Sequence, residues 1–160
     1  MTGFEPTDLR TLHGKFVTGV TVVTTTDDVT PYGLTLNAFS SLTLDPPLIM
    51  VSIQTSSATY KPMFSAKHFA VNILAADQEQ VARTFASKRD DKFSDAEWAP
   101  GLHGSPILDG ATAWLEAETT ERVRVGTHTL FVGRVCELAF TPRPPLVYAG
   151  GAFFDGALLG

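Results

Sequence analysis

The pattern of hydrophobic and polar positions in the first third of the chain predicts one short helix followed by strands. Residues 7–15 place their apolar side chains on one face, as a helix does. Residues 17–26 are dense in Val and Thr, which favour strands, and residues 30–41 return as a second strand after an Asp-Asp turn. Residues 48–53 are apolar almost throughout, which predicts a strand buried on both faces.

Two more helices are predicted in the middle of the chain. One begins near Thr59, a good N-cap residue, because the proline three positions later is tolerated only in a first helical turn. Residues 68–74 form a strand, and residues 77–86 form a helix capped by Asp77, with a Gln three residues later. The predicted buried stripe of that helix comprises Val81, Ala82, Phe85 and Ala86.

The rest of the chain predicts a loop and then an antiparallel series of strands. Residues 87–110 are loop-rich, and residues 111–125, 127–140 and 145–148 have extended patterns. The whole chain, 1–160, is therefore expected to be a single, mainly β domain with short inserted helices. A closed or split antiparallel barrel protects its strand edges better than an open sheet, whereas a doubly wound parallel sheet would need regular alternation of strands and helices.

Composition narrows the class of protein. A net charge of −5 argues against nucleic acid as a partner. The single cysteine, Cys136, allows no internal disulfide and suits a reducing cytoplasm, and its apolar surroundings predict a buried structural thiol. The N-terminal residues lack a signal-peptide pattern, and no apolar run approaches the ~20 residues of a membrane helix. We expect a cytoplasmic protein that binds no membrane.

Small hydroxyl and amide side chains gather near the end of the second predicted strand, beside the apolar strand over 48–53. Such neutral donors beside an apolar wall suit a flat ligand with polar edges, such as a flavin. The chain is expected to bend after Asn37, so that backbone N–H groups also face the ligand. An ordinary turn that satisfies its own backbone is the alternative. The small hydroxyl and amide residues of this segment, with one alanine among them, are Thr35, Asn37, Ala38, Ser40 and Ser41.

Two further segments could hold a phosphate group. Residues 56–61 contain hydroxyl side chains, including Ser57 and Thr59, at the start of a predicted helix, where free N–H groups favour anions. Ordinary helix capping is the alternative. In the charged segment over 88–93, Lys92 could reach a phosphate and Phe93 could cover a ring, although a solvated loop explains the pattern equally simply.

His128 follows a Gly-Thr turn and opens an apolar strand, where it could line a nicotinamide pocket. A histidine satisfied within the core is the alternative. No other potential ligand has metal-site spacing with His128, so we expect no metal. The chain also lacks a nucleophile elbow, a Rossmann fingerprint and a Walker loop. A nicotinamide cofactor would therefore bind outside a Rossmann fold.

Five segments, in order, resemble the short-chain flavin reductases, the small partners of two-component flavin monooxygenases. They are the Gly-Val-Thr-Val-Val-Thr at 19–24, the block over 37–53, and residues 69–74, 129–135 and 145–148. The resemblance implies an FMN-binding split β-barrel that is antiparallel and Greek-key-like. It also implies a homodimer, with FMN or FAD in a groove near the subunit interface.

The resemblance further implies roles for residues. The isoalloxazine and ribityl groups would be contacted by the small residues near the end of the second predicted strand, Thr35, Asn37, Ala38, Ser40 and Ser41. Ser52, Ser57 and Thr59 would contact ribityl or phosphate groups, supported by Lys92 and Phe93, while His128 would line the nicotinamide site and Tyr148 would close it. Two departures concern the nicotinamide: Thr127 stands where the family has Asp, and Ala-Gly-Gly follows Tyr148 where the family has an aromatic or basic residue.

The implied reaction is hydride transfer from C4 of NADH or NADPH to N5 of the flavin, followed by release of reduced flavin to a separate monooxygenase. Neutral donors suffice for this chemistry. A pyridoxamine-phosphate-oxidase-like barrel would need a basic cluster that the sequence lacks, and a lipocalin-like barrel leaves the helices unexplained. A non-catalytic flavin-binding module, favoured by Thr127, remains the main alternative.

Overall fold

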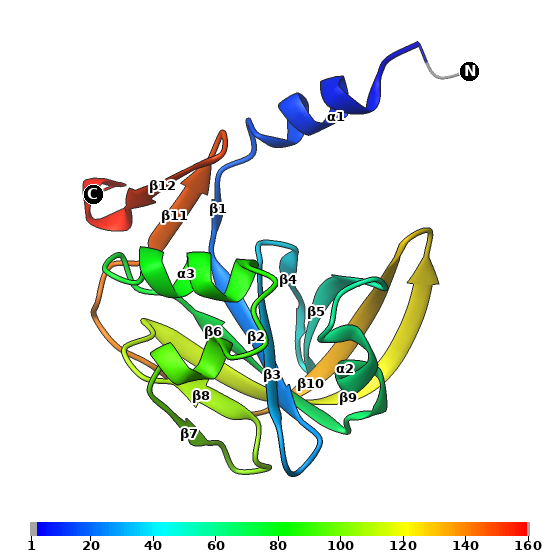
Figure 1. Ribbon diagram of the computed structural model, residues 1–160, viewed down its shortest axis with the longest axis vertical. Helices are drawn as coiled ribbons and strands as arrows, with labels where there is room; N and C mark the ends of the chain where they lie inside the picture. The colour runs from blue at the N-terminus through cyan, green and yellow to red at the C-terminus, as the bar shows by residue number, and fades with distance from the viewer. Residues whose placement is uncertain (1–2, 160) are drawn as a thin grey trace.

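The computed structural model describes residues 3–159, which are mainly β (Figure 1). The helices are α1 (Pro6–His13), α2 (Tyr60–Ser65) and α3 (Glu79–Ala86), with 3-10 turns η1 (Lys92–Asp95) and η2 (Gly156–Leu159). The strands are β1 (Thr18–Gly19), β2 (Thr21–Thr26), β3 (Pro31–Leu36), β4 (Phe39–Leu44), β5 (Pro47–Gln54), β6 (His68–Ile73), β7 (Trp98–Pro100), β8 (Pro106–Leu108), β9 (Ala113–Val125), β10 (His128–Phe140), β11 (Leu146–Ala149) and β12 (Ala152–Asp155).

A seven-stranded sheet in the order β3-β2-β6-β9-β10-β5-β4 forms the body of the molecule, and every neighbouring pair is antiparallel. Its two edge strands, β3 and β4, are separated in the chain only by residues 37–38. The sheet must therefore curl until its edges approach each other, yet β3 and β4 do not pair. This confirms the predicted split antiparallel barrel.

Two hydrophobic clusters fill the fold. One, inside the barrel, contains Val23, Val51 and Phe131, and the other lies beneath α3 and contains Val22 and Phe85. Adjacent residues of β2 therefore point into different clusters, and β2 is buried on both faces, as is its neighbour β6.

The prediction that residues 48–53 are buried on both faces is wrong. Burial alternates along β5: Ile49, Val51 and Ile53 are buried, while the intervening side chains are partly exposed. Only one face of this strand meets the barrel core. Its uniform apolarity concealed the period of two that distinguishes a half-buried strand.

Other element predictions need correction at their ends. Residues 30–41 form two strands, β3 and β4, rather than one. Helix α3 begins at Glu79 with Gln78 as N-cap, so Asp77 does not cap it, and the side chain of Gln78 instead accepts the N–H of Ala75 at 2.9 Å. In the predicted stripe of α3, Ala82 and Phe85 are buried, whereas Ala86 is exposed.

The N-terminal helix α1 extends away from the barrel beside the small sheet β1-β11-β12 (Figure 1). None of its residues is buried within this chain, and Leu12 and the following Phe16 expose 63% and 76% of their surface. The apolar face predicted for this helix therefore exists, but the chain itself does not cover it.

Cys136 is exposed, so the expectation of a buried structural thiol is wrong. Val135, the residue before it on β10, packs against the barrel core, so the alternation of side chains along the strand turns the thiol outward. Among residues 3–159, no helix is both long enough and apolar enough to cross a membrane.

Candidate functional site

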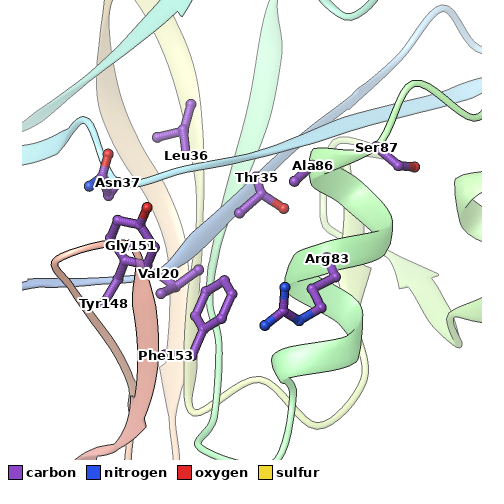
Figure 2. A pocket seen from close by; sticks show the side chains of 10 residues that line it. All are labelled: Val20, Thr35, Leu36, Asn37, Arg83, Ala86, Ser87, Tyr148, Gly151 and Phe153. Atoms are coloured by element: carbon purple, nitrogen blue, oxygen red, sulfur yellow. The ribbon is translucent and has the colours of Figure 1, made fainter. Parts of the chain in front are cut away.

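A cavity of about 500 Å³ opens between α3, the end of β3 and the β11-β12 hairpin (Figure 2). Three of the residues singled out from the sequence, Thr35, Asn37 and Tyr148, line it together. The remaining lining residues are Val20, Leu36, Arg83, Ala86, Ser87, Gly151 and Phe153. The volume lies within the usual range for sites that bind small molecules and cofactors.

The bend expected after Asn37 is present and shapes one side of the cavity. Strand β3 ends at Leu36, and the N–H of Phe39 donates to the carbonyl of Asn37 at 2.9 Å. The exposed Asn37 amide therefore projects at the rim, clear of either strand (Figure 2). Two residues earlier, the Thr35 hydroxyl donates to the carbonyl of Ala82 at 2.6 Å, which ties β3 to α3.

An aromatic pair forms the opposite wall. Tyr148 and Phe153 are paired across β11 and β12, and their ring centroids lie 5.4 Å apart. The connection between these strands uses Gly150 and Gly151 at φ values of +57° and +83°, a backbone region that glycine enters at little cost. The Ala-Gly-Gly segment seen as a departure in the sequence is thus the turn that presents Tyr148 and Phe153.

Arg83 provides a positive charge beside the aromatic wall. Its guanidinium lies 5.1 Å from the ring centroid of Phe153, and Nη2 donates to Oε1 of Glu79 at 2.7 Å. Sequence reasoning did not select Arg83, Ser87 or Phe153. For Arg83 the available signal was spacing, because positions 79 and 83 lie one turn apart on one helical face, whereas no local pattern marked Phe153.

A second hollow of about 550 Å³ continues the groove toward the end of α1. It shares Asn37, Tyr148 and Gly151 with the first cavity, and the segment His13 to Phe16 lines its other side. Together the two hollows make an elongated groove, and the three shared residues mark its middle.

Ala38, Ser40, Ser41 and Ser52 lie outside the cavity, on the adjoining β4-β5 ribbon. Ser40 is opposite Met50 and Ser41 is opposite Ile49, so the two hydroxyls belong to opposite faces of the ribbon. The N–H of Ser52 donates to the carbonyl of Ala38 at 3.1 Å, which extends the ribbon toward the bend.

Ser57 and Thr59 hold the start of α2 against β3. The Ser57 hydroxyl accepts the N–H of Thr59 at 3.2 Å, and the Thr59 hydroxyl donates to the carbonyl of Gly33 at 3.1 Å. Thr59 is the N-cap residue, as predicted, but its side chain does not cap the helix. With Thr59 only 2% exposed, its hydroxyl acts here within the fold.

Lys92 and Phe93 lie behind β3. The Lys92 ammonium donates to the carbonyls of Gly33 and Phe85 at 3.2 and 3.0 Å, and burial lowers its pKa. The ring of Phe93 meets that of Phe85 edge-on at 4.9 Å. In this chain the pair supports the strand that carries Thr35.

His128 opens β10 opposite Gln54, at the hairpin end of β9 and β10, and does not line either hollow of the groove. Its Nδ1 lies 3.0 Å from the hydroxyl of Thr127. Figure 1 shows this hairpin on the far side of the barrel from β11 and β12. Within one chain, His128 and Tyr148 therefore do not share a pocket.

The groove fits a flavin in its chemistry. Val20, Leu36 and the Phe153 ring provide apolar surface, Thr35, Asn37 and Tyr148 provide neutral hydrogen-bonding groups, and Arg83 can pair with a phosphate. The hydroxyl donors and the cation lie on different elements around the same opening. An elongated ligand with a ring at one end and a phosphate at the other matches that distribution.

Comparison with known proteins gives the family. The model of the flavin reductase like domain matches residues 13–157. The chain therefore belongs to this family, which confirms the resemblance found in its sequence.

Individual relatives support the assignment. The reductase component of the flavin-dependent trigonelline monooxygenase of Acinetobacter baylyi is 42% identical over 151 residues, covering 94% of this chain and 49% of the relative. The FMN reductase (NADH) SmoA of Agrobacterium fabrum is 37% identical, with 94% and 86% covered. The chain spans about half the length of some of these relatives, including one from Rhizobium meliloti of which 51% is covered.

A solved structure agrees with the fold. The NADH:FAD oxidoreductase SgcE6 of Streptomyces globisporus, solved with NAD and FAD fragments, superposes with a TM-score of 0.90. It is 35% identical in sequence, and the match covers 97% of this chain and 96% of that one. The split barrel is thus shared over nearly the full length of both chains.

Proposed function

We propose that this chain is an NAD(P)H:flavin oxidoreductase that supplies reduced FMN or FAD to a separate monooxygenase. The observation that carries the proposal is the groove at Asn37 and Tyr148, in a chain that belongs to the flavin reductase like domain family. Relatives of known role point the same way, since one is a reductase component of a monooxygenase and another an NADH-dependent FMN reductase.

The residues of the groove have distinct tasks in this proposal. Thr35, Asn37 and Tyr148 orient the ligand through hydrogen bonds, Phe153 provides a flat apolar surface, and Arg83 holds a phosphate. When bound, the flavin supplies the hydride acceptor. The protein needs no acid or base for this step, and the neutral character of the donors agrees with that requirement.

The predicted site residues that do not line the groove lie mainly on the β4-β5 ribbon and at the β9-β10 hairpin, and we assign them the roles that follow. Ala38, Ser40 and Ser41 contact the flavin, Ser52 and Ser57 contact its ribityl or phosphate groups, and His128 lines the nicotinamide site. Thr59, Lys92 and Phe93 take part through the backbone and side chains they hold in place. The direct contacts are predictions drawn from the family resemblance, whereas the supporting roles of Thr59, Lys92 and Phe93 rest on their hydrogen bonds and ring packing around β3.

A homodimer completes the proposal. Within one chain, His128 lies away from the groove that contains Tyr148, while α1 leaves an apolar face uncovered. A second copy that covers Leu12 and Phe16 removes this exposed apolar surface from water. It also offers a way to bring a His128 to the groove of its partner.

The experiment that tests the function compares NADH and NADPH as donors. Oxidation of each is followed by absorbance, with FMN, with FAD and without flavin. The proposal expects flavin-dependent oxidation of at least one nucleotide. A protein that binds flavin and oxidises neither nucleotide would instead be the non-catalytic binding module.

A further inference from the structure

His68, His103 and Cys136 meet at a place separate from the groove, since none of them lines either of its two hollows. One potential ligand atom from each lies within 4.8 Å of the others. His68 opens β6, His103 belongs to the connection between β7 and β8, and Cys136 is on β10. Three separate segments thus bring two imidazoles and a thiol together.

The backbone around the cluster directs these side chains toward each other. A β-bulge between Val135 and Glu137 leaves Cys136 as the extra residue, and bulges commonly re-aim a side chain. Glu116, whose side chain is fully buried, accepts the N–H groups of His103 and Ser105 at 2.9 and 3.0 Å. The connection that carries His103 is therefore fastened to the sheet directly beside His68.

Two imidazole nitrogens and a thiolate are a donor set that suits Zn²⁺ and related divalent transition metals. Zinc takes nitrogen at about 2.0–2.1 Å and sulfur at about 2.3 Å, so tetrahedral ligand atoms lie roughly 3.3–3.8 Å apart. The present separations, at most 4.8 Å, must shorten by up to about 1–1.5 Å, so a side chain has to move for all the ligands to reach one ion. Glu118, with Oε2 3.9 Å from Nε2 of His68, can supply the fourth ligand.

One ring must turn for the metal to bind. The imidazoles of His68 and His103 are stacked, with centroids 3.9 Å apart and planes 5° from parallel. A ring nitrogen binds a metal in the plane of its own ring, and two parallel planes share no point. His103 is exposed and lies in a connection, whereas His68 is on a strand, so His103 is the ring that turns.

We propose that His68, His103 and Cys136 bind a divalent transition metal ion of the zinc type, with Glu118 completing the site. Three bonds form to neutral nitrogen and thiolate donors, one forms to the carboxylate, and the thiol proton leaves to solvent. The ion would join β6, β10 and the β7-β8 connection. Its role is structural, and it is independent of flavin reduction.

Cobalt(II) added to metal-free protein tests this site, because a thiolate ligand gives a charge-transfer absorption in the near ultraviolet. The proposal expects that band to saturate at one ion per chain and to disappear in Cys136→Ser. His103→Asn should weaken binding at least about 10-fold. The matched control, His13→Asn, removes a histidine outside the cluster and should bind cobalt as the unaltered protein does.

Zinc provides a second readout that needs no flavin. At about 100 times its dissociation constant it should raise the melting temperature by roughly 5–10 °C, and Cys136→Ser should abolish this shift. Circular dichroism without metal shows whether each variant folds. The proposal is overturned if the unaltered protein gives no thiolate band, or if folded Cys136→Ser gives the same band.

Discussion

The hydroxyl of Thr127 lies 3.0 Å from Nδ1 of His128. This contact occurs at the position where the family has an aspartate, and the hydroxyl can therefore orient the ring as a carboxylate would. It lacks the negative charge that would stabilise an imidazolium. The departure found in the sequence thus preserves a hydrogen-bonding partner for His128, which favours the reductase over the non-catalytic module.

Replacing Thr127 tests whether that contact serves the nicotinamide. Thr127→Val keeps the shape of the side chain and removes the hydrogen bond, whose typical value is about 0.5–1.5 kcal/mol. We expect the KM for the nicotinamide nucleotide to rise about 2–10-fold, with flavin affinity unchanged. Steady-state kinetics provides the measurement and Thr127→Ser, which retains the hydroxyl, is the control. Equal kinetics for the two variants would contradict the assignment.

Arg83 allows a test of where the phosphate binds. Arg83→Gln should weaken FMN binding by about 10-fold or more, because a hydrogen bond to a charged group contributes about 1.5–3 kcal/mol. Riboflavin, which has no phosphate, should bind both proteins alike. Quenching of flavin fluorescence gives both affinities, and Lys88→Gln controls for net charge. If riboflavin binding fell as much as FMN binding, Arg83 would not be the phosphate partner.

Gly133 provides a test of the barrel core. A Cβ atom built there would lie 2.8 Å from Cζ of Phe69 and 2.9 Å from Cβ of Ala117. Gly133→Ala should therefore lower the free energy of unfolding by about 1–3 kcal/mol, seen as a lower melting temperature. Gly19→Ala is the matched control, since nothing lies within 4 Å of its added Cβ. The same melting temperature in both variants would refute the packing described here.

The apolar face of α1 predicts the assembly. Leu12→Glu together with Phe16→Glu should shift the protein from dimer to monomer, because both side chains are exposed within one chain. Light scattering during size-exclusion chromatography gives the mass directly. Val29→Glu adds charge at an even more exposed apolar residue, in the β2-β3 turn, and it should leave the dimer intact. A monomeric unaltered protein would contradict the proposed homodimer.

The sequence alone predicted a mainly β antiparallel barrel, because strands and helices leave local signals in the chain: the density of Val and Thr and the spacing of apolar residues. It failed where burial depends on distant neighbours. The run over 48–53 gave no sign that β5 meets the core on one side only, and nothing local indicated that Val135 packs against the core and so turns Cys136 outward. The predicted cap of α3 was also wrong, because the helix begins at Glu79 with Gln78 as its N-cap and no side chain caps it.

Of the candidate site, too, one part could be predicted from the sequence and another part could not. Thr35, Asn37 and Tyr148 were found from the sequence, and the fold brings them to one groove. The roles of Thr59 and Lys92 within the fold could not be foreseen, because both donate to the carbonyl of Gly33 across long sequence separations. Phe153 was missed because its contact with Arg83 joins β12 to α3, a packing that no local pattern encodes.

The most direct test of the central claim is the initial rate of NADH oxidation at increasing FMN concentration, with protein concentration held constant. Loss of the reduced nucleotide is followed by its absorbance under anaerobic conditions, so that FMN is the acceptor. We expect a rate that rises with FMN and saturates, and that falls in Asn37→Ala. A rate that stays at the protein-free background at every FMN concentration, with NADPH as with NADH, would contradict it.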